Sequence, residues 1–382
     1  MLYKRIFQSP RHNFFLFGPR GTGKSTLMQQ EFPNAIYINL LLPEVLRSFL
    51  ARPEQLFQLI DANPSKNTII IDEIQNAPAI LSGVHQLIEQ KKNLQFILTG
   101  SSSRKLKRTG ADLLGGRALK CMLHPFMAKE IEDIFKLDVA LQKGMLPLLI
   151  PAENPKAVLD AYVNLYLREE IQAEGLVRNI ENFSRFLEVI SFSHAALLNV
   201  SNISRECEVK RKTVENYLQI LKDLLLSFEL KVFDKRAQRE LSAHQKFYLF
   251  DAGIFQALRP RGPLDRKEEI EGTALEGMVA AHLIAWNDYG HDKHQIAFWR
   301  TRSGLEVDFI VYGENTFFAI EVKNGNQVHT TDLRSLKEFK KDYPMAELIF
   351  LYRGKERLLV DGIHCIPCEQ FLLALTPNKS LI

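Results

Sequence analysis

The stretch FLFGPRGTGKSTL occupies residues 15–27 and contains a complete G-x-x-x-x-G-K-S pattern from Gly18 to Ser25. The apolar run before it, residues 13–17, is typical of a buried parallel strand, and residues 25–30 after it indicate a helix. Glycines let the backbone curl so that successive N–H groups point at phosphate oxygens, and the helix N-terminus adds its positive end. We therefore predict an α/β fold with a phosphate-binding loop; the alternative is a glycine-rich turn that binds nothing.

The side chains of this loop predict a nucleotide triphosphate bound with a metal ion. We expect Lys24 to reach the β- and γ-phosphates and the Ser25 hydroxyl to bind Mg²⁺. The expected cofactors are therefore ATP and Mg²⁺. The candidate nucleotide-binding residues of the loop are Gly18, Pro19, Arg20, Gly21, Thr22, Gly23, Lys24, Ser25 and Thr26.

A second apolar run, Thr68 to Ile71, ends in an acidic pair, Asp72 and Glu73. Consecutive isoleucines favour a central strand covered on both faces, and such strands place ligands at their carboxyl ends. We expect Asp72 to contact the nucleotide and hold Mg²⁺, and Glu73 to act as the catalytic base that polarises the attacking water. The alternative interpretation is a strand with a solvated acidic end.

A third strand, residues 94–102, ends in small polar residues, of which Thr99 and Ser101 are candidates for sensing the γ-phosphate. A polar exit from the strand is the alternative. A basic stretch follows, with Arg104, Lys105, Lys107, Arg108 and, after a glycine pair, Arg117. An arginine supplied by a neighbouring subunit stabilises charge in the transition state. Arg117 is our candidate for this catalytic role, against a plain surface arginine, and the role implies a homo-oligomer; a hexameric ring is one candidate form.

These landmarks resemble one family of proteins. GPRGTGKS, the strand ending in Asp72-Glu73 and the polar third strand are similar to the core of an AAA-type ATPase of the additional-strand P-loop class, over about the first 125 residues. The resemblance implies a parallel-sheet domain that binds and hydrolyses ATP.

Composition restricts the remaining possibilities. The chain has 382 residues, which favours two or three domains, and a net charge of +4, too small to indicate nucleic-acid binding by itself. It has four cysteines, and we find neither an apolar run long enough for a membrane span nor the pattern of a signal peptide. We therefore expect a cytoplasmic protein that does not bind membranes.

The middle of the chain predicts a helix, a short helix, a long helix and a hairpin, which resembles a winged helix-turn-helix. The long helix has an apolar stripe at helical spacing, Val214, Tyr217, Leu218 and Leu221 among it. Its start is basic, and the candidate DNA-binding residues are Lys210, Arg211, Lys212 and Thr213. A module for protein interaction or a rigid linker is the alternative.

The last third predicts a hairpin that brings Asp308 close to Glu321 and Lys323, which lie two apart and so share one face of a strand. A preceding helix can add Glu276. This D…E-x-K arrangement resembles restriction-endonuclease-like nucleases. The resemblance implies that Asp308, Glu321 and Glu276 hold Mg²⁺ and that Asp308, Glu321 and Lys323 are catalytic. A hairpin with a solvated polar edge is the alternative.

The whole chain is similar to a prokaryotic family that joins an AAA-type ATPase to a restriction-endonuclease-like domain of unclear role. We predict an ATPase domain in residues 1–125, a helical and winged-helix domain in 126–258 and an α/β nuclease-like domain in 259–382. The leading hypothesis is an oligomeric ATPase acting on DNA that controls a Mg²⁺-dependent endonuclease. The alternatives are a nucleotide-switched DNA-binding regulator or scaffold with an inert nuclease-like domain, and a switch whose partner is protein.

Overall fold

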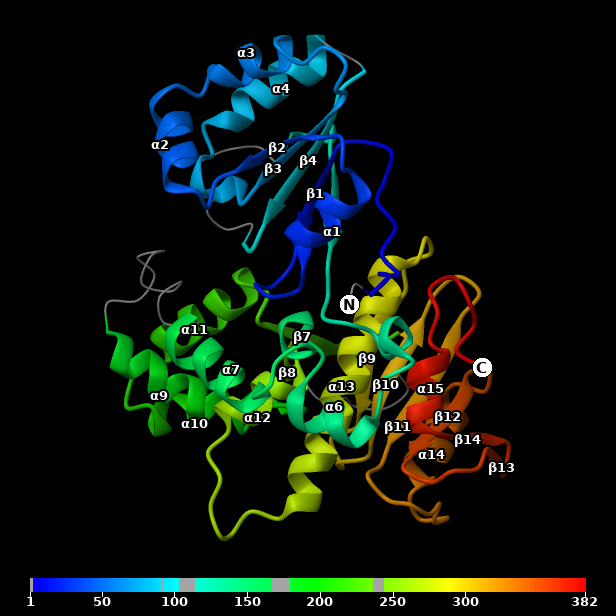
Figure 1. Cartoon of the computed structure of the whole chain (residues 1–382). Helices are drawn as coiled ribbons and strands as arrows, with labels where there is room; N and C mark the ends of the chain where they lie inside the picture. Colours follow the sequence, from blue (N-terminus) through cyan, green and yellow to red (C-terminus); the bar gives the residue numbers. More distant parts are fainter. Residues whose placement is uncertain (1–2, 91–92, 103–113, 167–178, 236–243) are drawn as a thin grey trace. The chain divides into compact units, whose positions relative to one another are not determined.

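The computed structural model describes residues 3–90, 93–102, 114–166, 179–235 and 244–382. The chain divides into two compact units, each described by itself below (Figure 1). Residues 4–124 with 221–226 form the N-terminal unit. Residues 1–3, 125–220 and 227–382 form the C-terminal unit. No helix in the described ranges is both long and apolar enough to cross a membrane.

In its described residues, the N-terminal unit is built on a parallel sheet of five strands in the order β2-β3-β4-β1-β5. The strands are β1 (Phe14–Phe17), β2 (Ile36–Asn39), β3 (Thr68–Asp72), β4 (Gln95–Gly100) and β5 (Leu119–Met122). Strand β4 lies between β1 and β3, so the strand before the phosphate loop and the strand before the acidic pair are not neighbours. This insertion is what the term additional-strand describes, and it agrees with the predicted parallel-sheet domain.

The helices of this unit cover the sheet, which explains why the strands β1, β3 and β4 are largely buried and apolar in their interiors. They are α1 (Lys24–Glu31), α2 (Pro43–Ala51), α3 (Gln55–Asp61), α4 (Ile80–Gln90) and the 3₁₀ turn η1 (Ile74–Asn76). Alternate strand residues such as Phe15, Ile71 and Leu98 share one core with α4 residues such as Val84. All four residues of β1 are buried, as expected for a strand covered on both faces.

The C-terminal unit, where it is described, contains a mixed sheet of nine strands in the order β13-β14-β12-β11-β10-β9-β7-β8-β6. These are β6 (Ala196–Leu197), β7 (Ser227–Val232), β8 (Lys246–Leu249), β9 (Gln295–Arg300), β10 (Glu306–Tyr312), β11 (Phe317–Val322), β12 (Glu347–Tyr352), β13 (Leu358–Val360) and β14 (Ile363–Pro367). Strands β10 and β11 pair antiparallel, with Phe309 opposite Ile320, so the predicted hairpin is present.

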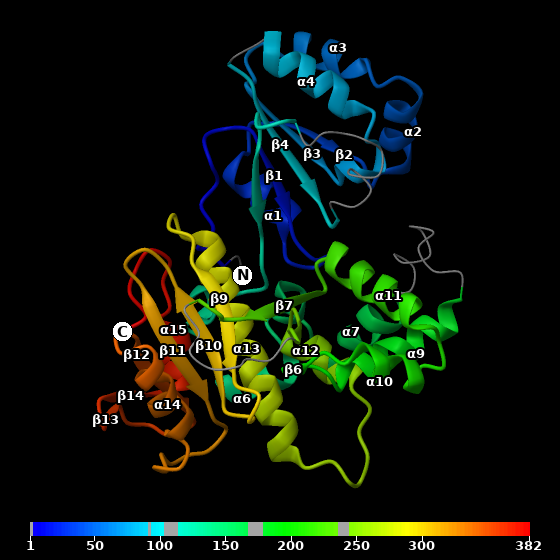
Figure 2. The same cartoon turned by 180° about the vertical axis from the view of Figure 1, so that it is seen from behind.

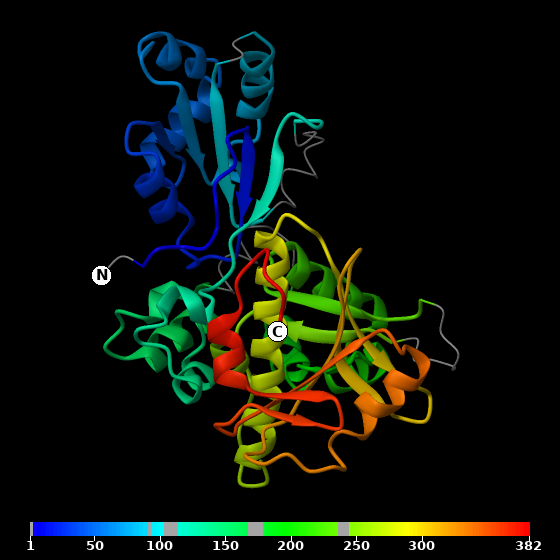
Figure 3. The ribbon, with the colours of Figure 1, turned by 90° about the vertical axis from the view of Figure 1, so that its right-hand side faces the viewer.

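The helices of this unit are α6 (Leu137–Lys143), α7 (Pro155–Ala161), α9 (Ile180–Ser191), α10 (Val200–Glu206), residues 211–220 of α11 (Arg211–Asp223), α12 (Ala252–Leu258), α13 (Lys267–Tyr289), α14 (Arg334–Asp342) and α15 (Cys368–Ala374). Short turns η2 (Ala128–Ile131), η3 (Pro147–Leu149) and η4 (Tyr162–Tyr166) connect some of them. Figures 1 and 2 show α14 beside β10 and β11, which it contacts. The long helix α13 contacts α6, α12 and β8 (Figure 3).

One pairing joins the two parts that the sequence predicts as separate domains. Strand β7 runs parallel to β9, with Lys231 opposite Ala297 and Val232 opposite Phe298. Strands of the predicted middle domain therefore belong to the same sheet as those of the predicted nuclease-like domain, and both fall in one compact unit. The division at 258/259 stays a prediction; it falls between α12 and α13.

Candidate functional site

The phosphate loop connects β1 to α1 with two glycines in the left-handed region of backbone conformation. Gly21 has a φ of 83° and Gly23 a φ of 86°, and α1 begins directly after Gly23. Gly18 is required for space, since a Cβ there would lie 2.3 Å from the carbonyl oxygen of Leu123. The loop therefore has the curled backbone that a phosphate group needs.

The polar side chains of the loop bind its own carbonyl groups. Lys24 Nζ donates to the carbonyl oxygens of Gly18, at 2.7 Å, and Pro19, at 3.2 Å. The loop is also held from outside its motif, because Arg5 donates to the carbonyl oxygens of Thr22, at 2.8 Å, and His124, at 2.7 Å. Sequence reasoning missed Arg5, and a single arginine before the first strand carries no pattern that would have revealed it.

Asp72 is the point at which the loop and the neighbouring strands meet. Its Oδ2 accepts a hydrogen bond from Ser25 Oγ at 2.7 Å and another from the Tyr37 hydroxyl, and its Oδ1 accepts one from Thr99 Oγ1. Asp72 is 1 % exposed. The structure thus brings together Ser25, Asp72 and Thr99, all predicted from the sequence, and adds Tyr37 of β2.

The residues around Asp72 fit a magnesium ion. A carboxylate and a hydroxyl oxygen 2.7 Å apart are hard donors of the kind that Mg²⁺ prefers, and they lie where the loop would hold phosphate. Burial, followed by the hydrogen bond to Asp72, raises the pKa of Tyr37 above its usual value, so Tyr37 stays a neutral donor. No sequence motif marks Tyr37; the parallel pairing of β2 with β3 puts it opposite Ile70, from where its hydroxyl reaches Asp72.

Glu73 leaves the strand in an uncommon conformation. Its φ of 59° lies in the left-handed region, which costs free energy for a residue other than glycine. Its N–H donates to Thr99 Oγ1 at 3.1 Å, and its carboxylate accepts from Gln75 Nε2 and, at 3.3 Å, from Ser101 Oγ. Gln75 also donates to Ser101 Oγ at 3.1 Å. The side chain proposed as the base is therefore held by two neighbours, of which Gln75 was not predicted.

Arg117 lies on the surface of the N-terminal unit. Its Nε pairs with Glu89, and its side chain is 41 % exposed. Gly115 and Gly116, just before it, both have positive φ. The structure shows no contact of Arg117 with the phosphate loop within the described residues. The other basic candidates of this region, Arg104, Lys105, Lys107 and Arg108, lie outside the residues that are described.

A second cluster of charges lies in the C-terminal unit. Lys246 Nζ, on β8, is 2.6 Å from Glu276 of α13 and 2.5 Å from Glu306 of β10. It is also 3.1 Å from Asp308 of β10. The Tyr248 hydroxyl donates to Glu276 at 2.7 Å. Desolvation, with the nearby Asp308 adding to it, raises the pKa of Glu276 to about 7. Sequence reasoning missed Lys246, Tyr248 and Glu306 as members of this cluster.

Glu321 and Lys323 pair with each other at the end of β11. Burial raises the pKa of Glu321 well above its usual range, and the charge of Asp308 adds to this effect. Burial alone would lower the pKa of Lys323, but the carboxylates of Glu321 and Asp308 raise it. The Oε2 atom of Glu321 is buried without a hydrogen-bond partner among the described residues.

The carboxylates proposed as metal ligands from the resemblance are paired with lysines in this structure. In the part of the chain that the structure describes, no group of three or more Asp, Glu, His or Cys side chains is arranged to hold a metal ion. The predicted ligands Glu276 and Asp308 both contact Lys246 instead, and Glu321 contacts Lys323. The strand β8, distant in sequence, brings the ammonium group of Lys246 among these acids.

The basic start of α11 is largely exposed. Lys210, Arg211 and Lys212 are exposed, and Thr213 is half-buried. Glu215, one turn on, pairs with Arg211 at 3.1 Å and with Lys212 at 3.5 Å. The apolar stripe on the same helix is buried, with Val214 fully so.

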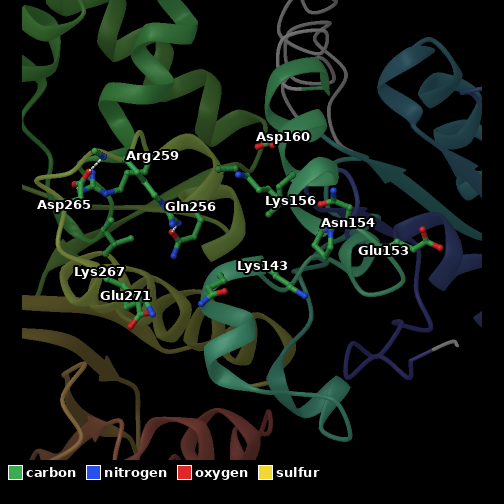
Figure 4. A pocket seen from close by; sticks show the side chains of 17 residues that line it. Lys143, Glu153, Asn154, Lys156, Asp160, Gln256, Arg259, Asp265, Lys267 and Glu271 are labelled. Carbon is green, nitrogen blue, oxygen red and sulfur yellow. Dashed lines mark hydrogen bonds and ion pairs between the residues drawn. The ribbon is translucent and has the colours of Figure 1, made fainter.

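A pocket of about 830 Å³ lies among α6, α7, α12 and the start of α13, apart from the residues discussed above (Figure 4). Lys143, Lys156 and Arg259 contribute positive charge to its wall. Acidic side chains balance them: Arg259 pairs with Asp265 at 2.7 Å, which Figure 4 shows as a dashed line. None of the predicted site residues lines this pocket.

Comparison with known proteins supports an AAA domain in the N-terminal part of the chain. Residues 10–132 match the model of a family described as AAA domain. Residues 135–265 and 271–371 match two models described as domains of unknown function. An uncharacterized protein of Haemophilus influenzae is 22 % identical over 391 residues, covering 93 % of each chain. An uncharacterized protein of Methanocaldococcus jannaschii is 23 % identical over 383 residues, covering 91 % of this chain and 84 % of the other.

Solved structures with some likeness include replication initiation proteins. The initiator DnaA bound to AMPPCP and single-stranded DNA is 14 % identical, with a TM-score of 0.27 over 56 % of this chain and 83 % of that one. Domain III of DnaA from Thermotoga maritima is 15 % identical, with a TM-score of 0.22 over 45 % and 81 %. The match to the AAA domain model, with the loop and the five-stranded parallel sheet, supports a nucleotide-binding P-loop ATPase of AAA type in the N-terminal unit.

Proposed function

We propose that this chain is a Mg²⁺-dependent ATPase whose catalytic centre is formed by Lys24, Ser25, Asp72 and Glu73. The observation that supports it most directly is the hydrogen bond of 2.7 Å between Ser25, in the phosphate loop motif, and Asp72, because these are the two side chains that we propose as Mg²⁺ ligands. Bound Mg²⁺ supplies charge to neutralise the phosphates.

Side chains of the protein bind the phosphates, activate the attacking water and position the base. When ATP binds, the ammonium group of Lys24 exchanges its hydrogen bonds to the Gly18 and Pro19 carbonyls for bonds to phosphate oxygens. This exchange needs no large movement of the side chain. Glu73 orients the attacking water and takes its proton. Ser101 and Gln75 hold the Glu73 carboxylate, so they act on the reaction by positioning the base.

We further propose that ATP hydrolysis requires a second copy of the chain. Arg117 follows two glycines with positive φ, and its exposed side chain pairs with Glu89, a bond between exposed groups that costs little to break. In a homo-oligomer this arginine is able to reach the γ-phosphate bound by its neighbour. Hydrolysis is then expected to depend on protein concentration.

We propose DNA as the partner of the middle segment. Helices α9, α10 and α11 are followed by β7 and β8, which pair with each other, and this is the order of a winged helix-turn-helix. Lys210, Arg211 and Lys212 are exposed at the start of α11, the end that enters the major groove in such modules. Glu215 offsets part of their charge, so the interface favours phosphate contacts of moderate strength.

Binding of duplex DNA by the full chain tests this proposal. The double variant Lys210→Ala and Lys212→Ala should weaken binding and reduce its salt dependence. Binding with fewer lysine–phosphate contacts releases fewer counterions from the DNA. The matched control is Lys267→Ala, an exposed lysine on α13 that we place outside the interface. Binding that does not respond to the double variant, or to salt, would favour the protein-interaction module.

Endonuclease activity stays a prediction, and the arrangement around Lys246 favours the alternative of a nucleotide-switched DNA-binding regulator with an inert C-terminal part. DNA cleavage should be assayed with ATP, with a non-hydrolysable analogue and with neither, for the natural chain and for Glu321→Ala. Cleavage that Glu321→Ala abolishes would establish endonuclease activity. A lack of cleavage in all three conditions would favour the nucleotide-switched DNA-binding regulator.

A further inference from the structure

The acidic cluster of the C-terminal unit is organised around a lysine. The side chain of Lys246 is 3 % exposed, and its ammonium group lies 2.5–3.1 Å from carboxylate oxygens of Glu276, Glu306 and Asp308. These acids come from α13 and β10, whereas Lys246 comes from β8. An isolated buried ammonium group is very unfavourable, so this lysine and these acids depend on one another.

Protein donors contact most of the carboxylate oxygens of this cluster. Asp308 Oδ1 accepts from Lys246 Nζ, and Asp308 Oδ2 accepts from the backbone N–H of Val322 at 2.9 Å. Glu306 Oε1 accepts from Lys246 at 2.5 Å, and its Oε2 pairs with Arg300. Both oxygens of Asp308 and of Glu306 therefore have protein partners, and Glu276 receives Lys246 and Tyr248 at its Oε1.

The ammonium group of Lys246 also disfavours a second cation beside it. A divalent ion needs oxygens at about 2.0–2.6 Å, depending on the ion, which is close to the space that the Lys246 ammonium fills. Two positive charges a few ångströms apart in a buried site repel each other strongly. Glu321 has one free buried oxygen, Oε2, and a single oxygen is too few to hold the ion alone.

We infer that Lys246 is a resident cation that takes the place of the divalent metal, so that the C-terminal unit uses its acidic cluster to join β8, β10 and α13 and binds no metal there. The cluster is then a structural ion network in a nuclease-like arrangement. This inference concerns a different site from the ATPase and holds whether or not the chain hydrolyses ATP.

Binding of Mn²⁺ to the full chain, followed by electron paramagnetic resonance without nucleotide, tests the inference. All proteins carry Asp72→Ala, which removes the metal ligand of the N-terminal unit. We compare this background with the additional changes Asp308→Asn, Lys246→Met, and Lys246→Met together with Asp308→Asn. We expect Asp308→Asn alone to change nothing, since no ion is bound at the cluster.

Removal of the ammonium should create the metal site. We expect the Lys246→Met protein to bind one more Mn²⁺ per chain than the background protein. The Kd for this ion should be at least tenfold below that of any Mn²⁺ bound by the background protein, and Asp308→Asn should abolish the gain. If Lys246→Met does not fold, Lys246→Met with Glu276→Gln keeps the charge balance of the cluster and replaces it in the same comparison. A background protein that loses bound Mn²⁺ on Asp308→Asn would overturn the inference, as would a folded lysine variant that gains none.

Discussion

Ser25 Oγ donates a hydrogen bond of 2.7 Å to Oδ2 of Asp72, which links the first turn of α1 to the carboxyl end of β3. Two motifs far apart in the sequence thereby form one site. We propose both oxygens as Mg²⁺ ligands, so removing either should weaken Mg²⁺-dependent chemistry more than nucleotide binding itself.

We expect Asp72→Ala to lower ATP hydrolysis by about two to three powers of ten, because a catalytic metal contributes several kcal/mol to transition-state stabilisation. Steady-state phosphate release at saturating ATP measures it. Tyr37→Phe is the matched control, since it removes one hydrogen bond to Asp72 and keeps the carboxylate. Equal losses in both variants would argue that the carboxylate acts only through its hydrogen bonds.

Replacing the proposed base should separate binding from hydrolysis. We expect Glu73→Gln to retain affinity for ATP and to lose about 10²–10⁴-fold in kcat, the usual contribution of a general base. Gln75→Ala, which removes a donor to the Glu73 carboxylate, should lower kcat less and leave KM unchanged. Measurements of ATP affinity and kcat for each variant test this prediction. Unchanged hydrolysis by Glu73→Gln would show that Glu73 is not the general base.

Arg117 should act on the neighbouring subunit. We expect Arg117→Ala to reduce hydrolysis about a thousandfold or more, as for arginines supplied in trans. Mixing Arg117→Ala with Glu73→Gln should restore part of the activity, because mixed interfaces pair an intact base with an intact arginine. Glu89→Ala, which removes only the exposed partner of Arg117, is the control and should keep its activity. Two inactive proteins that stay inactive when mixed would contradict the role.

Helix α13 offers a test of packing in the C-terminal unit. A Cβ at Gly277 would lie 2.0 Å from Nε2 of the buried His194, so we expect Gly277→Ala to lower the free energy of unfolding by about 1–3 kcal/mol. A Cβ at Gly272, on the same helix, would meet its nearest neighbour at 3.5 Å. Gly272→Ala should therefore raise stability by about 0.5–1 kcal/mol, since alanine favours a helix interior. Urea unfolding of both variants checks the opposite signs.

Stability should also depend on pH through Asp251, which caps α12. Burial raises the pKa of this carboxyl from 3.8 to about 6, against the effect of the backbone N–H groups of Met145, Ile254 and Gly253. The folded state thus holds the proton more tightly than the unfolded state, so this group stabilises the fold increasingly as pH falls from about 6 to about 4, and this contribution disappears as pH rises through 6.

Asp251→Asn removes this titration. The natural chain should therefore gain about 1–2 kcal/mol relative to the variant between pH 7 and pH 4.5, since one unit of pKa shift corresponds to about 1.4 kcal/mol. Urea unfolding at both pH values measures the difference. Parallel pH dependence of the two proteins would show that Asp251 does not titrate in this range.

Local patterns predict the nucleotide site well because short segments build it. The glycine spacing sets the curl of the loop, and a parallel strand exposes its last residue, Asp72, at the same edge. Tyr37 and Gln75 were not predictable in this way, since their roles depend on the pairing of β2 with β3 and on the left-handed turn at Glu73. The hairpin predicted from the two apolar runs is present, but its local pattern says nothing of what else approaches Glu321 and Lys323.

The sequence alone determined that a phosphate loop precedes a helix, that an acidic pair ends a buried strand, and that acids gather on a hairpin, because all three follow from spacing along one segment. Only the tertiary structure decided what those acids contact. The parallel pairing of β7 with β9 carries β8 into the same sheet and places Lys246 among Glu276, Glu306 and Asp308. A buried charged side chain pairs with groups on the strands that lie nearest to it in space. The order of strands in a sheet cannot be predicted from a local sequence pattern.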